Sequence, residues 1–215
     1  MAKVKVSKKS TRIDMTAMCD VAFLLLSFFI MSATAKQPEP HPVDTPASTV
    51  IDKLPEDGVA TITVGDKKVF FNIPGKELKI ETLKRISNEY NMSFTEGEYE
   101  AFGNMQGFGV PLNQLKGLLK LEAAERNAGD LQKGIPYDTV NNQLSSWVQQ
   151  AREASKAILE QQILDGEDKV FKDLDIAIKG DADEEYPTVK RVIDILQEQK
   201  KNRFFLVTGL RNEDF

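Results

Sequence analysis

One apolar stretch near the start of the chain constrains its fold more than any other feature. Residues 15–35 contain a single ionisable carboxylate, Asp20, and no basic residue. A helix over this stretch would be about 32 Å long at 1.5 Å per residue, close to the hydrocarbon thickness of a bilayer. The stretch therefore predicts one transmembrane helix, which we place at residues 13–35.

Basic residues on one side of this stretch predict its orientation. Residues 1–12 contain five Lys or Arg residues and no acidic residue. Because positively charged flanks stay in the cytoplasm, we expect residues 1–12 to form a cytoplasmic tail and the chain beyond the helix to lie outside the cytoplasmic membrane. A cleavable signal peptide has a similar basic start, apolar run and small-residue end, so a secreted interaction domain is the alternative.

Asp20 favours a retained, working membrane helix over a signal peptide. A charged side chain inside a membrane helix costs about 2.5–3.5 kcal/mol on insertion scales, and such residues are generally found where they function. Thr16 lies four residues before Asp20 and Ser27 seven residues after it, so the three share one helical face. We expect this face to meet a partner protein or water rather than lipid. Alternatively, Thr16 and Ser27 bond only to the backbone of their own helix.

The composition excludes several classes of function. With 33 acidic and 28 basic residues the net charge is -5, which argues against a general nucleic-acid binder. One cysteine, Cys19, and one histidine, His41, allow no disulfide framework, no zinc site with several thiolates and no cluster of histidine ligands. No nucleophile–base pair is recognisable either. We therefore expect no enzyme, no metal site and no cofactor.

The residues around Asp20 resemble the membrane signature of the ExbD/TolR family. In the stretch IDMTAMCDVAFLLL, residues 13–26, Asp20 stands at the family's protonatable aspartate and Thr16 at its threonine. Ala17 replaces the usual proline, and Cys19 replaces an aliphatic residue and is interpreted as a small buried hydrophobe. A second resemblance lies near the carboxyl end, where IKGD and YPTV are similar to the end of ExbD domains.

The resemblance implies a function for the chain. In this family a pair of such helices sits inside a ring of ExbB-type subunits in the inner membrane. The aspartate takes up protons from one side and releases them to the other, and the movement passes through the periplasmic domains to TonB, which opens outer-membrane transporters. The implied partners are thus an ExbB-like ring, a second copy of this chain and a TonB-like protein. The implied proton carrier is Asp20. The TolR branch, which serves envelope integrity with TolA, is the alternative within the family.

A proline-rich segment follows the predicted helix. Residues 36–55 hold five of the nine prolines, which predicts an extended periplasmic linker. At about 3.1 Å per residue such a linker would reach roughly 60 Å. His41 lies within it and is expected to be a solvated linker residue.

The remaining residues, 56–215, predict an α+β periplasmic domain with a small mixed sheet, helices packed on one face and a mainly helical insertion at about 75–165. Alternating β-branched residues predict a hairpin with strands at 59–64 and 69–71 and a Gly65-Asp66 turn. A strand at 174–178, a helix at 188–200 and a strand at 204–207 predict parallel neighbours.

Three helices are expected within the insertion, at 76–90, from Pro111 to near Gly129, and from a cap at Asp138 to Gly166. Residues 93–110 predict an irregular packed loop, and Trp147 is expected in the core. An acidic run precedes the last helix of the chain and is interpreted as favourable placement at a positive helix end rather than as a divalent-cation site. It comprises Asp181, Asp183, Glu184 and Glu185.

Overall fold

The computed structural model describes residues 15–32, 39–49, 54–55, 58–127, 131–166 and 170–210. The chain divides into two compact units, Met1–Gln37 and Pro38–Phe215. We call the second unit the head. The predicted basic tail, 1–12, and both ends of the predicted membrane segment lie outside the described residues.

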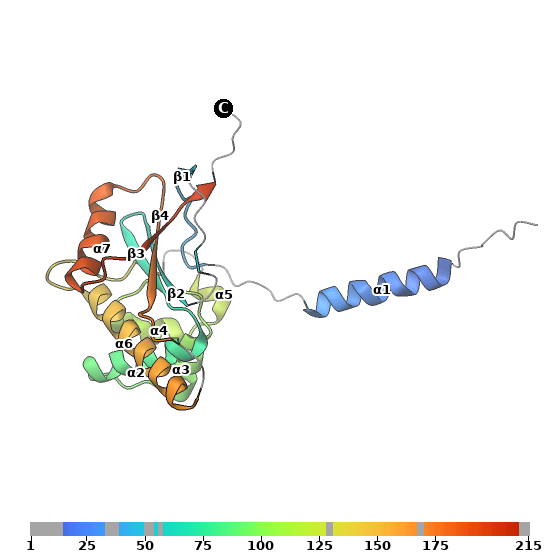
Figure 1. The fold of residues 1–215 in the computed structure, drawn as a ribbon, viewed down its shortest axis with the longest axis horizontal. Coiled ribbons are helices and arrows are strands. Elements are labelled where there is room, and N and C mark those ends of the chain that lie inside the picture. The colour runs from blue at the N-terminus through green and yellow to red at the C-terminus, as the bar shows by residue number, and fades with distance from the viewer. Residues whose placement is uncertain are drawn as a thin grey trace, which may run out of the picture. The chain divides into compact units, whose positions relative to one another are not determined.

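The first unit contains one described helix, α1 (Met15–Ser32), drawn in blue in Figure 1. Its 18 residues have a mean hydropathy of 1.9, and it alone among the described helices is long and apolar enough to cross a membrane. Its length of about 27 Å is close to the thickness of the hydrocarbon core. None of its residues is buried, so its apolar surface is available to lipid or to another protein.

The head is built on a four-stranded mixed sheet with the strand order β3-β2-β4-β5. Its strands are β2 (Val59–Gly65), β3 (Lys68–Asn72), β4 (Asp175–Gly180) and β5 (Phe205–Val207). The antiparallel β2–β3 hairpin and the parallel β4–β5 pair confirm the predicted pairings, and β2 and β4 are also parallel. The turn residues are Asp66 and Lys67 rather than Gly65 and Asp66. Both have positive φ, as a tight hairpin turn of the primed type requires.

Six described helices accompany this sheet, and Figure 1 shows α2, α6 and α7 together on one side of it. They are α2 (Lys76–Glu89), α3 (Glu96–Gly103), α4 (Leu112–Leu119), α5 (Ala123–Arg126), α6 (Gln143–Leu164) and α7 (Tyr186–Glu198). Alternate residues of β2 and β4, such as Ile62 and Ile176, enter one continuous core with these helices. The predicted mixed sheet with helices packed on one face is confirmed.

Trp147 of α6 lies in the middle of this core and is fully buried, as predicted. Its ring stacks on Phe102 at 5.7 Å and contacts Phe108 at 4.6 Å, measured between ring centroids. Phe71 of β3 packs edge-on against Phe108. The aromatic cluster therefore joins the insertion directly to the sheet.

The boundaries within the insertion differ from the predicted ones. The predicted loop at 93–110 contains α3, which begins with a capping box: Thr95 Oγ1 accepts from Glu98 N, and the Glu98 carboxylate accepts from Thr95 N at 2.8 Å. The Thr-x-x-Glu spacing was visible in the sequence, but the surrounding glycines obscured it. The predicted helix after Pro111 is two short helices, α4 and α5, and its expected end at Gly129 lies outside the described residues.

The start of α6 was also predicted wrongly. Its N-cap is Asn142, whose side chain accepts from Ser145 N at 3.1 Å, and not Asp138. Val140, placed on the apolar face by the prediction, is 99% exposed because it lies in the loop before the helix.

Residues 39–48, which we call the strap, lie across the sheet face opposite the helices. The ring of His41 stacks on Phe70 at 4.9 Å and Glu39 forms an ion pair with Lys179 at 2.7 Å. Further along, β1 (Ala47–Ser48) pairs in parallel with β6 (Gly209–Leu210). The expectation of a solvated His41 is therefore wrong, and the strap adds nothing to the expected 60 Å reach while it is packed in this way.

Gly109 and Gly117 form a matched pair for testing the packing of the head. A Cβ at Gly109 would lie 2.1 Å from Cδ1 of Phe70, which is itself held between His41 and Gly109. Gly109→Ala is therefore expected to lower the free energy of unfolding by about 1–3 kcal/mol. Nothing lies within 4 Å of a Cβ at Gly117 in α4, so Gly117→Ala is expected to raise it by up to ~1 kcal/mol. Thermal unfolding of the full chain, followed by the fluorescence of Trp147, measures both, and equal effects would contradict the packing of Phe70.

Candidate functional site

Asp20 lies in the second turn of α1 and is the only acidic or basic residue of that helix. Helical geometry places Thr16, Asp20 and Ser27 within an arc of about 40°. The structure thus brings the three predicted residues to one face of α1. The rest of the helix surface is almost entirely aliphatic or aromatic.

The hydroxyl groups of α1 can form hydrogen bonds within their own helix, whereas the carboxylate of Asp20 cannot. Ser27 Oγ donates to the carbonyl oxygen of Leu24 at 2.9 Å, and on another face of α1 Ser32 Oγ donates to Phe29 O at 3.3 Å. Ser27 thus forms the bond to its own helix backbone that the alternative includes. A carboxylate has no donor within its own helix backbone to bond in this way, so Asp20 is the group on this face that requires a partner or a proton.

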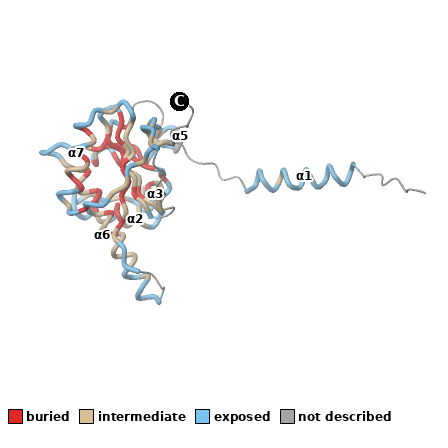
Figure 2. Tube along the Cα trace, turned by 45° about the horizontal axis from the view of Figure 1, so that its top comes forward, coloured by how far each residue is buried: buried red, intermediate tan, exposed pale blue. Residues whose placement is uncertain are grey.

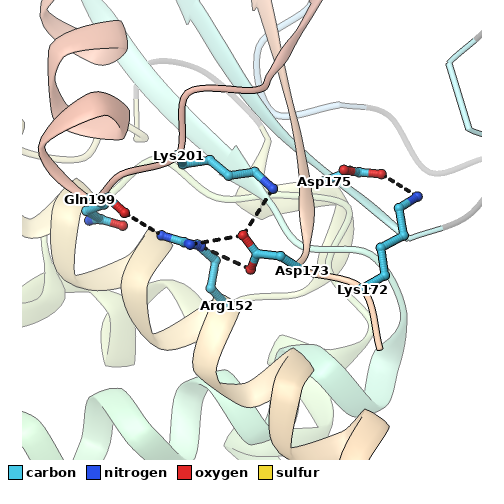
Figure 3. Close-up of polar contacts among 6 residues, drawn as sticks. All are labelled: Arg152, Lys172, Asp173, Asp175, Gln199 and Lys201. Atoms are coloured by element: carbon cyan, nitrogen blue, oxygen red, sulfur yellow. Dashed lines mark hydrogen bonds and ion pairs between the residues drawn. The ribbon is translucent and has the colours of Figure 1, made fainter. Parts of the chain in front are cut away.

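A second polar centre lies in the head and was not found from the sequence (Figure 3). The Asp173 carboxylate accepts from Arg152 Nη2 at 2.9 Å, from Arg152 Nε at 3.2 Å and from Lys201 Nζ at 3.1 Å. Arg152 also donates to the carbonyl oxygen of Gln199 at 3.0 Å. The cluster joins α6 to the segment before β4 and to the chain after α7. Its members are far apart in the sequence, so no local spacing signals it.

The cluster makes a pH-dependent contribution to stability. Burial alone would raise the pKa of Asp173, but the hydrogen bonds and charges of Arg152 and Lys201 outweigh burial and hold this pKa below its usual value. A carboxyl whose pKa falls on folding stabilises the folded state above its unfolded pKa, near 4. This contribution is lost as the pH drops through the lower folded pKa.

Asp173→Asn is expected to lower the free energy of unfolding by about 1–3 kcal/mol at neutral pH, because two cations lose their carboxylate. The difference from the native chain should shrink as the pH falls below about 4. Chemical unfolding of the full chain at neutral and acidic pH measures this. Asp165→Asn is the matched control, because Asp165 is exposed after the end of α6. A difference that does not change with pH would contradict the ion pairing.

The acidic run before α7 also bonds neighbouring backbone. Asp181 accepts from the backbone N–H groups of Asp44 at 3.3 Å and Asp183 at 3.0 Å. Glu184 accepts from Lys67 N at 3.0 Å. Glu185 is the N-cap residue of α7 and makes no side-chain cap hydrogen bond, so the acidic run does lie at the start of a helix, and Asp181 and Glu184 in addition bond the backbone of the strap and of the hairpin turn. Within the described ranges, no group of three or more His, Cys, Asp or Glu residues is arranged to hold a metal ion.

Comparison with known proteins gives the family. The sequence model described as biopolymer transport protein ExbD/TolR matches residues 7–210. The chain belongs to the ExbD/TolR family. Neither a curated protein nor a solved structure matches it. The matched range runs from before α1 to β6 and so covers nearly the whole chain.

Membership in the ExbD/TolR family makes this chain a subunit of a biopolymer-transport system. Members of the family are transport subunits rather than enzymes, and they work with ExbB/TolQ-like and TonB-like partners. The single membrane-length helix of the described chain agrees with a single-pass inner-membrane protein. Two parts of an ExbD/TolR protein are thus present: a membrane helix with one carboxylate and an α/β head.

Proposed function

We propose that this chain is the proton-carrying subunit of an inner-membrane complex that couples the proton motive force to TonB-dependent outer-membrane transport. The observation that carries the proposal is the lone carboxylate of Asp20 in an otherwise apolar α1, within the range that the family model matches. An ionised carboxylate is costly in lipid, so Asp20 would seek polar groups of the ring when ionised and enter apolar surroundings when protonated. The membrane potential supplies about 2.3 kcal/mol per charge per 100 mV, enough to bias such a cycle.

The arrangement in the membrane follows from the charges on either side of α1. Residues 1–12 form a cytoplasmic tail, residues 13–35 the transmembrane segment, and residues 36–55 a periplasmic connection whose strap, residues 39–48, packs on the periplasmic domain of residues 56–215. The five basic residues of the tail support this orientation. The exposed apolar surface of α1 supports a ring of membrane subunits around a pair of these chains.

The head is the part that passes movement to a TonB-like protein. β5 is one of the two edge strands of the four-stranded sheet, and an open edge can add an extended peptide as a further strand. Leu206, in the middle of β5, is exposed and offers an apolar contact there. A TonB-like segment paired with this edge is therefore the proposed contact.

Replacement of Asp20 by asparagine is the direct test of the proton-carrying role, and it is expected to abolish proton-driven transport. Copurification from membranes in mild detergent separates the two branches of the family: a TonB-like partner supports the proposal, and a TolA-like partner supports the TolR-like alternative. Intact-mass measurement of the native protein tests the secreted alternative, because retention of residues 1–35 excludes a cleaved signal peptide.

A further inference from the structure

The strap pairs with the last strand of the described chain, β6. This strand follows β5 after a single residue, Thr208, and it pairs with β1 of the strap rather than with the four-stranded sheet. Gly209 N also donates to the carbonyl oxygen of Pro46 at 3.0 Å. Among the described residues, β1 is the only strand that pairs with β6. The position of β6 therefore depends on whether the strap is packed.

The β1–β6 pair continues the sheet beyond the ends of β4 and β5. Ala182 N, two residues after the end of β4, donates to Asp44 O at 2.8 Å, and the strap then runs on to β6. The β4–β5 and β1–β6 pairs are both parallel, and Figure 1 shows β1 next to the red end of the chain. The strap thus lies beside β6 as β4 lies beside β5. While it is packed, the outer edge of the sheet extends over residues 205–210 instead of the three residues of β5.

The strap is held on the head by contacts at the surface. Its residues 39–48 are all half-buried or exposed, so the strap adds nothing to the buried trace that is red in Figure 2. It is anchored by the ring of His41 on Phe70, by the ion pair of Glu39 and by the N–H of Asp44. Segments with few buried side chains and exposed hydrogen bonds are the first to open in a folded protein. We therefore expect the strap to separate from the sheet while the rest of the head stays folded.

The strap is also the first part of the head that a movement of α1 reaches along the chain. Six residues, 33–38, connect the two, so the chain between Ser32 and Glu39 spans at most about 25 Å. A separation of α1 and the head beyond this length pulls on the Glu39 end of the strap. Release of the strap, residues 39–48, adds about 35 Å of extended chain to the tether.

We propose that the strap is a latch that couples the length of the tether to the partner-binding edge of the sheet. With the strap packed, the tether is short and β6 extends the β5 edge. Pulling the strap away lengthens the tether and removes β1, so that β6 loses its pairing and the edge shortens. The inference rests on the proposed function, which places a TonB-like segment at the β5 edge. It deepens that function, because it gives a movement of the membrane helix a way to weaken this contact.

A disulfide between the strap and β6 tests whether the latch must open. Thr45 Oγ1 lies 3.4 Å from an ideal Cβ at Gly209, close enough for a disulfide between cysteines at the two positions. Thr45→Cys combined with Gly209→Cys is expected to form this disulfide in the full chain and to lower proton-driven transport at least tenfold. A reductant should restore transport. Each single replacement retains Cys19 and is the control for it, because its transport should not respond to the reductant.

Gly65→Ala is expected to open the latch from the side of the sheet. A Cβ at Gly65 would lie 2.8 Å from Val43 Cγ1 and 2.9 Å from His41 Nε2, both in the strap. These are the nearest atoms, and Gly65 does not have a positive φ, so alanine disturbs the strap before any other part of the head. Gly117→Ala is the matched control, because nothing lies within 4 Å of a Cβ at that position.

Photo-crosslinking in cells measures the effect of Gly65→Ala on the edge. A benzophenone amino acid is placed at Thr208, beside β6, or at Leu206 in β5, both of which are exposed. Each is expected to form an adduct with a TonB-like protein in the otherwise native chain. Gly65→Ala should lower the yield at Thr208 at least threefold relative to the yield at Leu206, and Gly117→Ala should leave this ratio unchanged.

The outcomes separate the latch from the contact on which it rests. A block that the reductant reverses, together with the lower ratio in Gly65→Ala, supports the latch. The latch is overturned if the disulfide does not form, if the oxidised double variant transports normally, or if Gly65→Ala leaves the ratio unchanged. The proposed contact still stands in these cases when the native chain gives the adducts. Absence of a TonB-like adduct from the native chain at both positions overturns the contact at the β5 edge and the latch with it.

Discussion

Replacing Asp20 with asparagine is expected to reduce proton-driven transport to the level of cells that lack this chain. Asparagine is close in size to aspartate and preserves the polar contact, so insertion of α1 and assembly with the ring should remain intact. It cannot exchange a proton at any physiological pH, because its side-chain amide does not titrate. The measurement is energy-dependent uptake through a TonB-dependent transporter in cells that carry the variant as their sole copy, alongside copurification of the ring partner.

Two further variants separate the ionisable group from the polar face around it. Asp20→Glu keeps a titratable carboxyl one methylene further from the helix and is expected to retain part of the activity. Ser27→Ala is expected to change the activity less than about twofold, because Ser27 Oγ already bonds to the carbonyl oxygen of Leu24 and a helix tolerates the loss of such a bond. Undiminished uptake by the Asp20→Asn variant would contradict the proton-carrying role of Asp20.

Trp147→Ala is expected to lower the free energy of unfolding by about 3–5 kcal/mol, as for other large-to-small changes of fully buried aromatic residues. Trp147 has no exposed surface and contacts both Phe102 and Phe108, so its removal leaves a cavity between α6, α3 and the sheet. Far-ultraviolet circular dichroism of the full chain during thermal unfolding measures the loss, since the variant has no tryptophan fluorescence.

Trp147→Phe is the matched control for this change. The buried indole Nε1 has no hydrogen-bond partner among the described residues, so phenylalanine gives up no hydrogen bond and refills most of the volume. We expect it to cost less than about half as much as alanine, by the cavity argument. If alanine at position 147 cost less than about 1 kcal/mol, the insertion would not share its core with the sheet.

Structural elements whose sequence signal lies within a short stretch could be predicted. The β2–β3 hairpin and the β4–α7–β5 unit follow from alternation and helical spacing within about ten residues each. The start of α6 was missed because Asp138 and Asn142 are both good caps, and packing of Leu144 and Trp147 against the core decides between them. α3 was missed because the glycines at 97, 103 and 107 favour a loop, although the spacing of Thr95 and Glu98 is that of a capping box.

The same distinction, between residues close together in the sequence and residues brought together by folding, applies to the candidate site. Asp20, Thr16 and Ser27 lie within twelve residues of one another, and helical geometry alone puts them on one face. The packing of the strap could not be predicted, because a proline-rich segment is typical of a linker. The packing depends on the contacts of His41 with Phe70 and of Asp44 with Asp181, which form only in the folded chain. Contacts between residues 29 and 137 positions apart leave no local pattern.

The sequence by itself therefore determined the membrane helix and its single carboxylate, because the free energy of transferring side chains into a membrane depends on composition over a short span. It also indicated the family, through the residues around Asp20. Only the tertiary structure decided that the strap, residues 39–48, is packed on the sheet and that Arg152 and Lys201 share Asp173. These features arise where distant segments meet, and their energies come from burial and pairing that exist only after the chain has folded.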